Sequence, residues 1–352
     1  MSTLNSPPSL LDWFANQPEN KFPPNGGSLY TIRLEQVTGI LNSQVHSLVG
    51  VGAALADRGF LTDHGPDHIK TVIQRASLLL AHPESTFPQF TPYEIFMLLL
   101  AIHFHDVGNI FGREEHEKKH SQVMRQVESI IGDEMVERNA ILKIAQAHGG
   151  RINGNKDTLS SLVQEDFVLG QRIRYRALAA LLRFADELAD DCHRAARYAD
   201  KLGVIPPESE VYHAYAKSLH SVIVDLPNHI VRLHFSLLRK EAIRTYGKKL
   251  SETNQIEQVF LLDEIYLRTI KMHLERIYCM RFLRTIIQID AVEVSIEVYE
   301  ETNSLSPCID TIGYRLEEEG YPPNNNSSLR DLCPNVIFDG CGLSEYLQKG
   351  AE

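Results

Sequence analysis

Apolar residues recur at helical spacing through the first half of the chain. One such pattern runs from near Tyr30 toward Leu55, and a second helix is expected from Pro66, because proline is favoured in the first turn of a helix. Further helices are predicted at 92–105, 114–131, 133–147 and 171–197. We therefore expect the first half of the protein to be almost wholly helical.

The pattern changes in the second half of the chain. Residues 221–224 and 230–235 are short runs rich in β-branched side chains, and the Leu-Pro-Asn-His turn between them predicts a hairpin. A long helix is expected over about 254–285. Residues 291–299 alternate apolar and polar side chains, which is typical of a half-buried strand. These patterns predict a mainly α protein, in which a helical bundle is followed by a smaller C-terminal α+β region.

The same patterns divide the chain into four parts. Prolines, glycines and small polar residues at the start indicate a loosely held arm, and PPNNNSS at 322–328 has the composition of a linker. The predicted parts are an N-terminal arm at 1–28, a helical core at 29–205, an α+β accessory region at 206–320, and a linker and tail at 321–352.

Composition narrows the class of protein. The chain has 352 residues, 43% hydrophobic and 23% charged, which is ordinary for a folded soluble protein. Its formal net charge of -11 argues against a general nucleic-acid or anionic-membrane surface. Apolar stretches such as 95–102 are much shorter than the roughly 20 residues that span a bilayer. The first residues lack a secretory signal, so we expect a cytoplasmic protein.

Cysteine and histidine point to different roles. Five cysteines are scattered without a CxxC pair, so they are interpreted as reduced structural thiols. Fifteen histidines, several of them clustered in the first half, suggest metal ligands.

The central candidate is the run IHFHDVGN, where an apolar helix ends on His105 and Asp106. An imidazole and a carboxylate side by side at a helix end can both turn toward one cation, and the carboxylate can bridge two. His103, two residues before His105, is expected to point to the other side of this helix.

Other nitrogen and oxygen ligands follow in a suggestive order. His68 lies in TDHGPDHIKTV, His116 and His120 share a helix face in EEHEKKHSQV, and His148 stands beside two glycines in AQAHGG. Asp186, in LLRFADELADD, lies next to an apolar helix face and therefore needs a partner, and Asp190 could act beside it. Ligands of these types suit one or two divalent ions of Mn, Mg, Fe, Ni, Co or Zn.

In this respect the sequence resembles the HD superfamily of phosphohydrolases, whose ordered signature is H…HD…D on a helical bundle. The signature residues are matched in order over about residues 35–200 by His68, His105, Asp106 and Asp186. TDHGPDHIKTV, LLRFADELAD followed by Arg194, and HAYAKSLHSVIVD are closer to the HD-CE type of domain, found in bacterial conflict and nucleotide-signalling systems. The resemblance implies metal-dependent phosphate chemistry.

His120 and His148 resemble the extra histidines of HD enzymes that hold two metals, such as the HD-GYP phosphodiesterases. The spacing from Asp106 to His120 is shorter here, and the GYP motif is missing. The two extra histidines favour two metals over one. The missing GYP motif and the shorter spacing disfavour cyclic di-GMP as the substrate. His120 is preferred to His116 as the ligand, although either remains open.

The mechanism implied is attack of a metal-activated water on phosphorus. Asp106 would anchor the metals, and His64 is the candidate acid for the leaving oxygen. Phosphate also needs fixed positive charge. Arg151 is the first candidate, Lys217 matches a basic position of the HD-CE segment, and Arg113 lies near the proposed ligands.

The leading functional hypothesis is a nucleotide hydrolase, with a deoxynucleoside triphosphate or related phosphate ester as substrate. The alternatives are a cyclic-nucleotide or oligonucleotide phosphodiesterase, a nucleotide-sensing HD module without turnover, as in a bacterial defence system, and a di-iron oxygenase. Apolar surface at 254–285 and 291–299 also allows a homo-oligomer.

Overall fold

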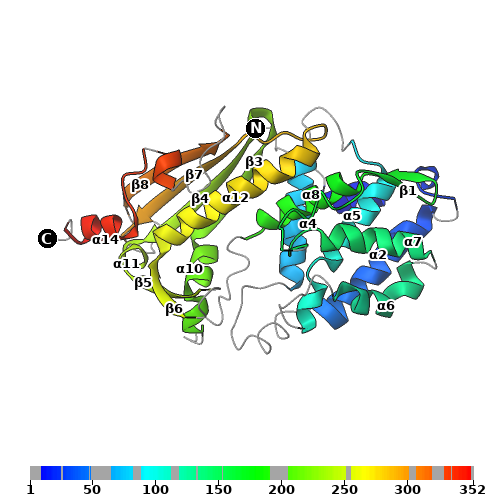
Figure 1. The fold of residues 1–352 in the computed structure, drawn as a ribbon, viewed down its shortest axis with the longest axis horizontal. Helices are drawn as coiled ribbons and strands as arrows, with labels where there is room; N and C mark the ends of the chain where they lie inside the picture. The colour runs from blue at the N-terminus through cyan, green and yellow to red at the C-terminus, as the bar shows by residue number, and fades with distance from the viewer. Residues whose placement is uncertain are drawn as a thin grey trace. The chain divides into compact units, whose positions relative to one another are not determined.

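The structure, a computed structural model, describes residues 9–24, 27–46, 48, 65–81, 89–111, 119–131, 134–152, 154–190, 205–250, 255–300, 307–318, 329–333 and 335–349. The chain divides into two compact units (Figure 1). The first comprises Met1–Arg58, His64–Ala189 and Cys279–Gln288, and the second comprises Gly59–Asp63, Asp190–Tyr278 and Ile289–Glu352. The predicted mainly α fold with a smaller C-terminal region of mixed sheets is confirmed.

The first unit is a helical bundle built around α5. Its helices are α1 (Leu10–Ala15), α2 (Gly27–Ile40), α4 (Pro66–Leu80), α5 (Pro92–Phe104), α6 (His120–Ile131), α7 (Met135–Gln146) and α8 (Tyr175–Glu187). The unit also contains a π-helical turn (Leu41–His46) and short 3-10 helices (Glu19–Lys21 and Val107–Phe111). Every residue of α5 is buried, because α1, α2, α4, α7 and α8 all pack against it. A helix that is apolar on all sides is stable only in such a position.

The start of α5 is fixed by polar contacts. The Thr91 hydroxyl accepts a hydrogen bond from the Glu94 backbone N–H (3.1 Å), and the Glu94 carboxylate accepts one from the Thr91 backbone N–H (2.9 Å). Arg174, at the start of α8, also donates to the Glu94 carboxylate (2.9 Å). These bonds satisfy N–H groups that have no partner within the helix. They fix where α5 begins.

The helix predicted over 171–197 was wrong at its start. Residues 166–168 and 171–173 form a small antiparallel hairpin, β1 (Asp166–Val168) and β2 (Gln171–Ile173), and α8 begins only at Tyr175. Leu169 and Gly170 form the turn, with φ angles of 49° and 76°. Glycine is expected in this conformation, but leucine is not, so the turn is weakly signalled in the sequence.

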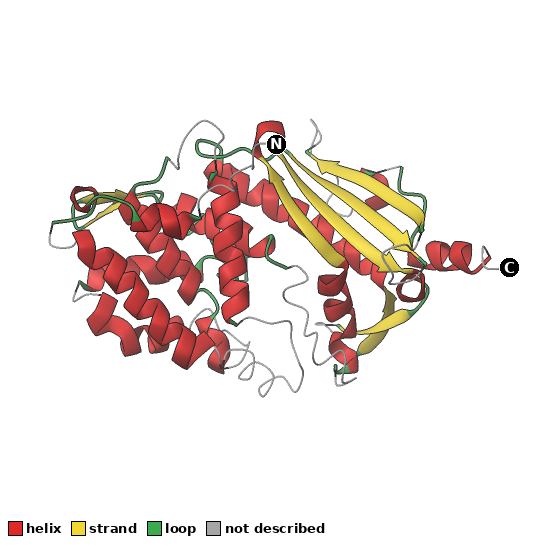
Figure 2. Cartoon of the chain, turned by 180° about the vertical axis from the view of Figure 1, so that it is seen from behind, coloured by secondary structure: helices red, strands yellow, loops and turns green. Residues whose placement is uncertain are grey.

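The second unit contains a four-stranded sheet with one long helix across it (Figure 2). The strand order is β3-β4-β7-β8, formed by β3 (Leu219–Asp225), β4 (Ile230–Leu238), β7 (Ala291–Tyr299) and β8 (Cys308–Glu317). β3 and β4 form the predicted antiparallel hairpin, whereas β4 and β7 are parallel. Parallel neighbours need a crossover, and the chain between them contains α12 (Leu261–Leu283). Thr269 of α12 is hydrogen-bonded to Tyr314 of β8 (2.8 Å).

The helix predicted from about 254 begins later, at Leu261. Residues 256–260 are instead the strand β6 (Ile256–Phe260), which pairs with β5 (Thr245–Lys249). The unit also contains short 3-10 helices (Pro207–Ser209 and Leu226–Asn228), α10 (Glu210–Ser218), α11 (Arg239–Ala242), α13 (Leu329–Leu332) and α14 (Gly340–Lys349). Among the described helices, none combines the length and apolar composition needed to cross a bilayer.

Two basic side chains of α12 are buried together. Arg276 donates a hydrogen bond to the Ile289 carbonyl (2.8 Å), and its other guanidinium nitrogen lies 3.5 Å from Nδ1 of His273. Burial, with the charge of Arg276, lowers the pKa of His273 to about 4. The fold therefore accommodates the neutral imidazole.

This histidine should make the second unit sensitive to acid. The unfolded chain takes up a proton near pH 6.5, whereas the folded chain takes it up only near pH 4, so the free energy of unfolding falls between these values. Between about pH 7.5 and about pH 5, the free energy of unfolding of the wild type should fall by about 2 kcal/mol more than that of His273→Gln. Urea unfolding of both proteins at the two pH values measures the difference. An equal loss in the variant and the wild type would contradict the assignment.

Candidate metal centre

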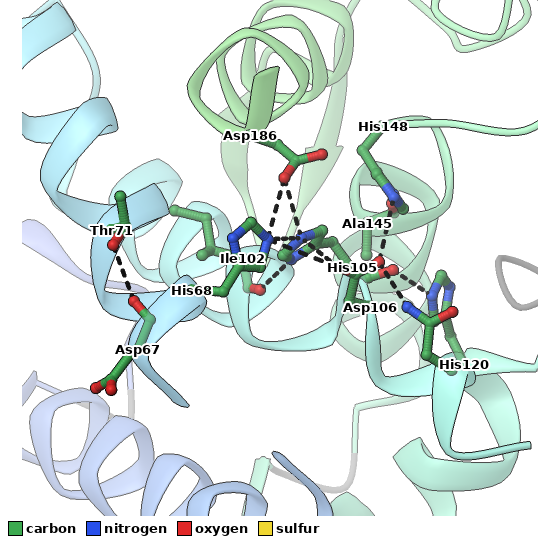
Figure 3. A network of polar contacts seen from close by, with 11 residues as sticks. Asp67, His68, Thr71, Ile102, His105, Asp106, His120, Ala145, His148 and Asp186 are labelled. Carbon is green, nitrogen blue, oxygen red and sulfur yellow. Dashed lines mark hydrogen bonds and ion pairs between the residues drawn. The ribbon is translucent and has the colours of Figure 1, made fainter. Parts of the chain in front are cut away.

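The predicted ligands come from helix ends of the first unit, which meet in one place (Figure 3). His68 lies in the first turn of α4, His105 and Asp106 follow α5, His120 begins α6, His148 follows α7, and Asp186 lies in the last turn of α8. Helix ends suit this task, because a side chain there can leave the packed face of its helix without disturbing the core.

Three of these residues, His68, His105 and Asp106, each place one ligand atom in a compact group, and Asp186 contacts both imidazoles of that group. His68 Nε2 lies 3.1 Å from Asp186 Oδ1 and 3.3 Å from His105 Nε2, and His105 Nε2 lies 3.3 Å from Asp106 Oδ2. Ligands bound to one cation at about 2.0–2.2 Å are themselves roughly 3–3.5 Å apart. The observed spacing is therefore that of ligands around a single ion. The ligand atoms of His68, His105 and Asp106 all lie within 4.8 Å of one another, which is close enough for these three residues to hold one metal ion.

In two of the histidines, a hydrogen bond to the backbone determines which ring nitrogen faces the centre. Nδ1 of His105 donates to the Ile102 carbonyl (2.6 Å), and Nδ1 of His148 donates to the Ala145 carbonyl (2.6 Å). In the neutral ring, a proton on Nδ1 leaves Nε2 with a lone pair. Metal-binding histidines are typically oriented by such a bond. The donor set therefore fits a divalent cation.

The electrostatics of the cluster also favour positive charge at its centre. Burial lowers the pKa of His105, but the carboxylates of Asp106 and Asp186 outweigh it and hold that pKa well above its ordinary value. Burial raises the pKa of Asp186, but hydrogen bonds from His105 and His68 hold it well below its ordinary value. A cation between these groups would satisfy both carboxylates while the imidazoles stay neutral.

The two oxygens of the Asp106 carboxylate face different neighbours. Oδ2 faces His68 and His105, whereas Oδ1 accepts a hydrogen bond from Asn109 (3.1 Å) and lies 3.9 Å from His148 Nε2. His120 lies on the His148 side, with its Nε2 donating to the His105 carbonyl (2.6 Å), so Nδ1 is the atom it could offer a metal. The two oxygens of Asp106 are thus directed toward different imidazoles, Oδ2 toward His68 and His105 and Oδ1 toward His148.

Two neighbours of the cluster were not foreseen from the sequence. Asn109 stands within the quoted run IHFHDVGN, three residues after Asp106, but its contact with the carboxylate follows only from the tight 3-10 turn there. His46 ends the π-helical turn, and its Nε2 lies 3.3 Å from Nδ1 of His103. His103 therefore packs against His46. Burial is the main cause that lowers the pKa of His46 to about 4 and that of His103 to about 3, so both are neutral.

The predicted phosphate-binding residues have other visible partners. Arg151 is exposed and donates to the Gly154 carbonyl (2.9 Å), and its role with phosphate stays a prediction. Lys217 lies on α10 of the second unit and forms an ion pair with Glu241 (3.2 Å).

Asp190, considered as a helper of Asp186, forms an ion pair with Arg268. Of the residues considered for the site or for the family motif, four lie outside the described part of the chain: His64, Arg113, His116 and Arg194.

Comparison with known families places these residues in context. The family HD-CE matches residues 58–268, a span that contains the whole ligand set. Comparisons with curated proteins and with solved structures gave no match. The matched span exceeds half of the chain, and it contains the segments on which the resemblance to HD-CE domains was based. The chain therefore belongs to the HD-CE family.

Proposed function

We propose that this protein is a metal-dependent phosphohydrolase that acts on a nucleotide, most simply a deoxynucleoside triphosphate or a related phosphate ester. Membership of the HD-CE family suggests an HD-type, metal-dependent hydrolase. The observation that carries the proposal is the Asp106 carboxylate, whose two oxygens face two different sets of imidazoles. A carboxylate in this position suits the bridge of a centre with two metals.

The proposed ligands would form two groups, one for each metal ion. His68, His105, Asp106 and Asp186 would hold the first ion, and His148 and His120 would hold a second that shares Asp106. Bound divalent ions would lower the pKa of water and neutralise charge on the phosphoryl oxygens.

The neighbours of the ligands keep this arrangement in place. The Ile102 and Ala145 carbonyls keep the protons of His105 and His148 on Nδ1, away from the centre. Asn109 donates a hydrogen bond to Oδ1 of Asp106, which limits rotation of this carboxylate.

Substrate binding calls for fixed positive charge outside the ligand set. Arg151 follows the His148-Gly149-Gly150 turn, so its guanidinium is the first candidate for a phosphate of the substrate. Lys217 and Arg113 are further candidates, and His64 is proposed as the acid that protonates the leaving oxygen. The choice of a nucleotide rests on the family resemblance and on the additional α+β unit, which is large enough to contribute to recognition.

The proposal can be tested by measuring the products that the purified protein forms from nucleotides, separated by chromatography. The protein is incubated with Mn, Mg, Ni, Co or Fe and with dNTPs, NTPs, mononucleotides or cyclic dinucleotides. Asp106→Asn keeps the shape of the side chain but removes its charge, and it should lower turnover at least about a thousandfold. Asp166→Asn changes an exposed carboxylate of the same unit and should leave turnover unchanged.

Full activity in Asp106→Asn would refute the hydrolase proposal. Absence of any nucleotide hydrolysis product from the wild type with every metal and substrate would also refute it, and would favour a sensing module that binds nucleotides without turnover.

The number of metals gives a separate prediction. The wild type should bind about two ions per chain, and His148→Ala and His120→Ala should each lower this toward about one, because each removes a ligand of the second position only. His220→Ala removes an exposed imidazole of the second unit and serves as the control. Metal analysis after gel filtration gives the stoichiometry. A wild-type value of about one ion, or a value near two that both variants keep, would contradict the assignment of His148 and His120 to a second position.

A further inference from the structure

A buried chain of hydrogen bonds joins α8 to the end of α7. Nη1 of Arg183 lies 2.9 Å from the Thr158 hydroxyl, and this hydroxyl lies 2.6 Å from the Ala147 carbonyl. The direction of both bonds follows from chemistry, because a guanidinium can only donate and a carbonyl can only accept. Arg183 therefore donates to Thr158, and Thr158 donates to Ala147. Thr158 is 1% exposed and Arg183 is 8% exposed.

Both ends of this chain lie next to proposed metal ligands. Ala147 ends α7 and directly precedes His148. Arg183 precedes Asp186 by three residues on α8, so the two side chains are neighbours along one side of that helix. The hydroxyl of Thr158 thus connects the backbone that presents His148 with the helix that presents Asp186.

The segment between His148 and Thr158 is held together locally by the paired backbones of Ile152 and Asn155 and by the bond from Arg151 to Gly154, and Thr158 bonds its end to α7. It contains Gly149, Gly150 and Gly154, and the last two adopt positive φ angles of 72° and 79°. Glycines allow many backbone conformations, so a turn rich in them needs contacts that select one. Thr158 supplies such a contact, and the charge of Arg183 strengthens it by polarising the hydroxyl.

His148 depends on this backbone twice. Its position is set by Ala147, whose carbonyl Thr158 holds, and its ring is oriented by the Ala145 carbonyl through Nδ1 (2.6 Å). A small rotation of the turn would carry Nε2 of His148 away from Oδ1 of Asp106, which lies 3.9 Å from it. The family signature read from the sequence does not include Thr158.

We propose that Thr158, supported by Arg183, is a positioning residue of the metal centre that sets the affinity of the position containing His148. The inference rests on the proposed two-position centre. Thr158 touches neither metal nor substrate in this account. It acts through the backbone of Ala147 and His148, in the way that contacts outside a ligand set tune metal affinity.

The test is calorimetric titration of the metal-free full chain with Mn²⁺ or Co²⁺, without substrate. Thr158→Val keeps the side-chain shape but removes the hydroxyl, and it should weaken the binding of one ion about 10- to 100-fold while the other stays within about twofold. Thr158→Ser restores the hydroxyl and should return the affinity to within about threefold of the wild type.

A matched control separates positioning from general destabilisation. Thr269→Val removes another buried hydroxyl, which bonds Tyr314 in the second unit, and it should leave both metal affinities unchanged. The visible d–d spectrum of bound Co²⁺ adds a readout of ligand geometry, which Thr158→Val should alter and Thr158→Ser should restore.

The inference is overturned if Thr158→Val binds every ion that the wild type binds with unchanged affinity, if it weakens all ions equally, or if Thr269→Val has the same effect. None of these outcomes depends on turnover. A wild type that binds metal but hydrolyses none of the nucleotides would refute the proposed hydrolase function and leave the role of Thr158 intact.

Discussion

The fold of the first unit depends on placing two carboxylates beside two imidazoles in its interior. Asp106 is buried, the Asp186 side chain is about one-quarter exposed, and both face Nε2 atoms of His68 and His105 that have no exposure at all. Such charges are costly to bury without a partner. The carboxylates and imidazoles stabilise each other's charged forms, which holds the pKa of His105 above and that of Asp186 below its ordinary value, and a divalent cation would satisfy all four groups together.

The bundle explains how these groups are brought together. Because α5 is apolar on every side, other helices surround it, and their ends meet where α5 ends. The capping bonds of Thr91 and Glu94 fix the beginning of α5, and the bond from Arg174 to Glu94 ties it to α8, which carries Asp186. Contacts far from the cluster therefore contribute to the register of the ligands, as does Thr158 close to it.

The strongly periodic parts of this structure can be predicted from the sequence. The parts that depend on partners far along the chain cannot. The apolar run 95–102 predicts a buried helix, and the helix expected at 92–105 ends at Phe104. The sequence of strand β6 also fits the start of a helix, because a short mixed run fits either period and its pairing with β5 is a tertiary contact. His103 could be predicted to diverge from His105, but its partner His46 lies 57 residues away. Asn109 and Thr158 carry no local signal of their roles.

The central claim is that Asp106 lies between two metal positions. Crystals of the protein grown with Mn²⁺ and measured at a wavelength where manganese scatters anomalously give the most direct test. The account predicts two anomalous peaks on opposite sides of the Asp106 carboxylate, one in contact with His68, His105 and Asp186 and the other in contact with His148. A single peak, or the absence of any peak at these residues in fully loaded crystals, would contradict it.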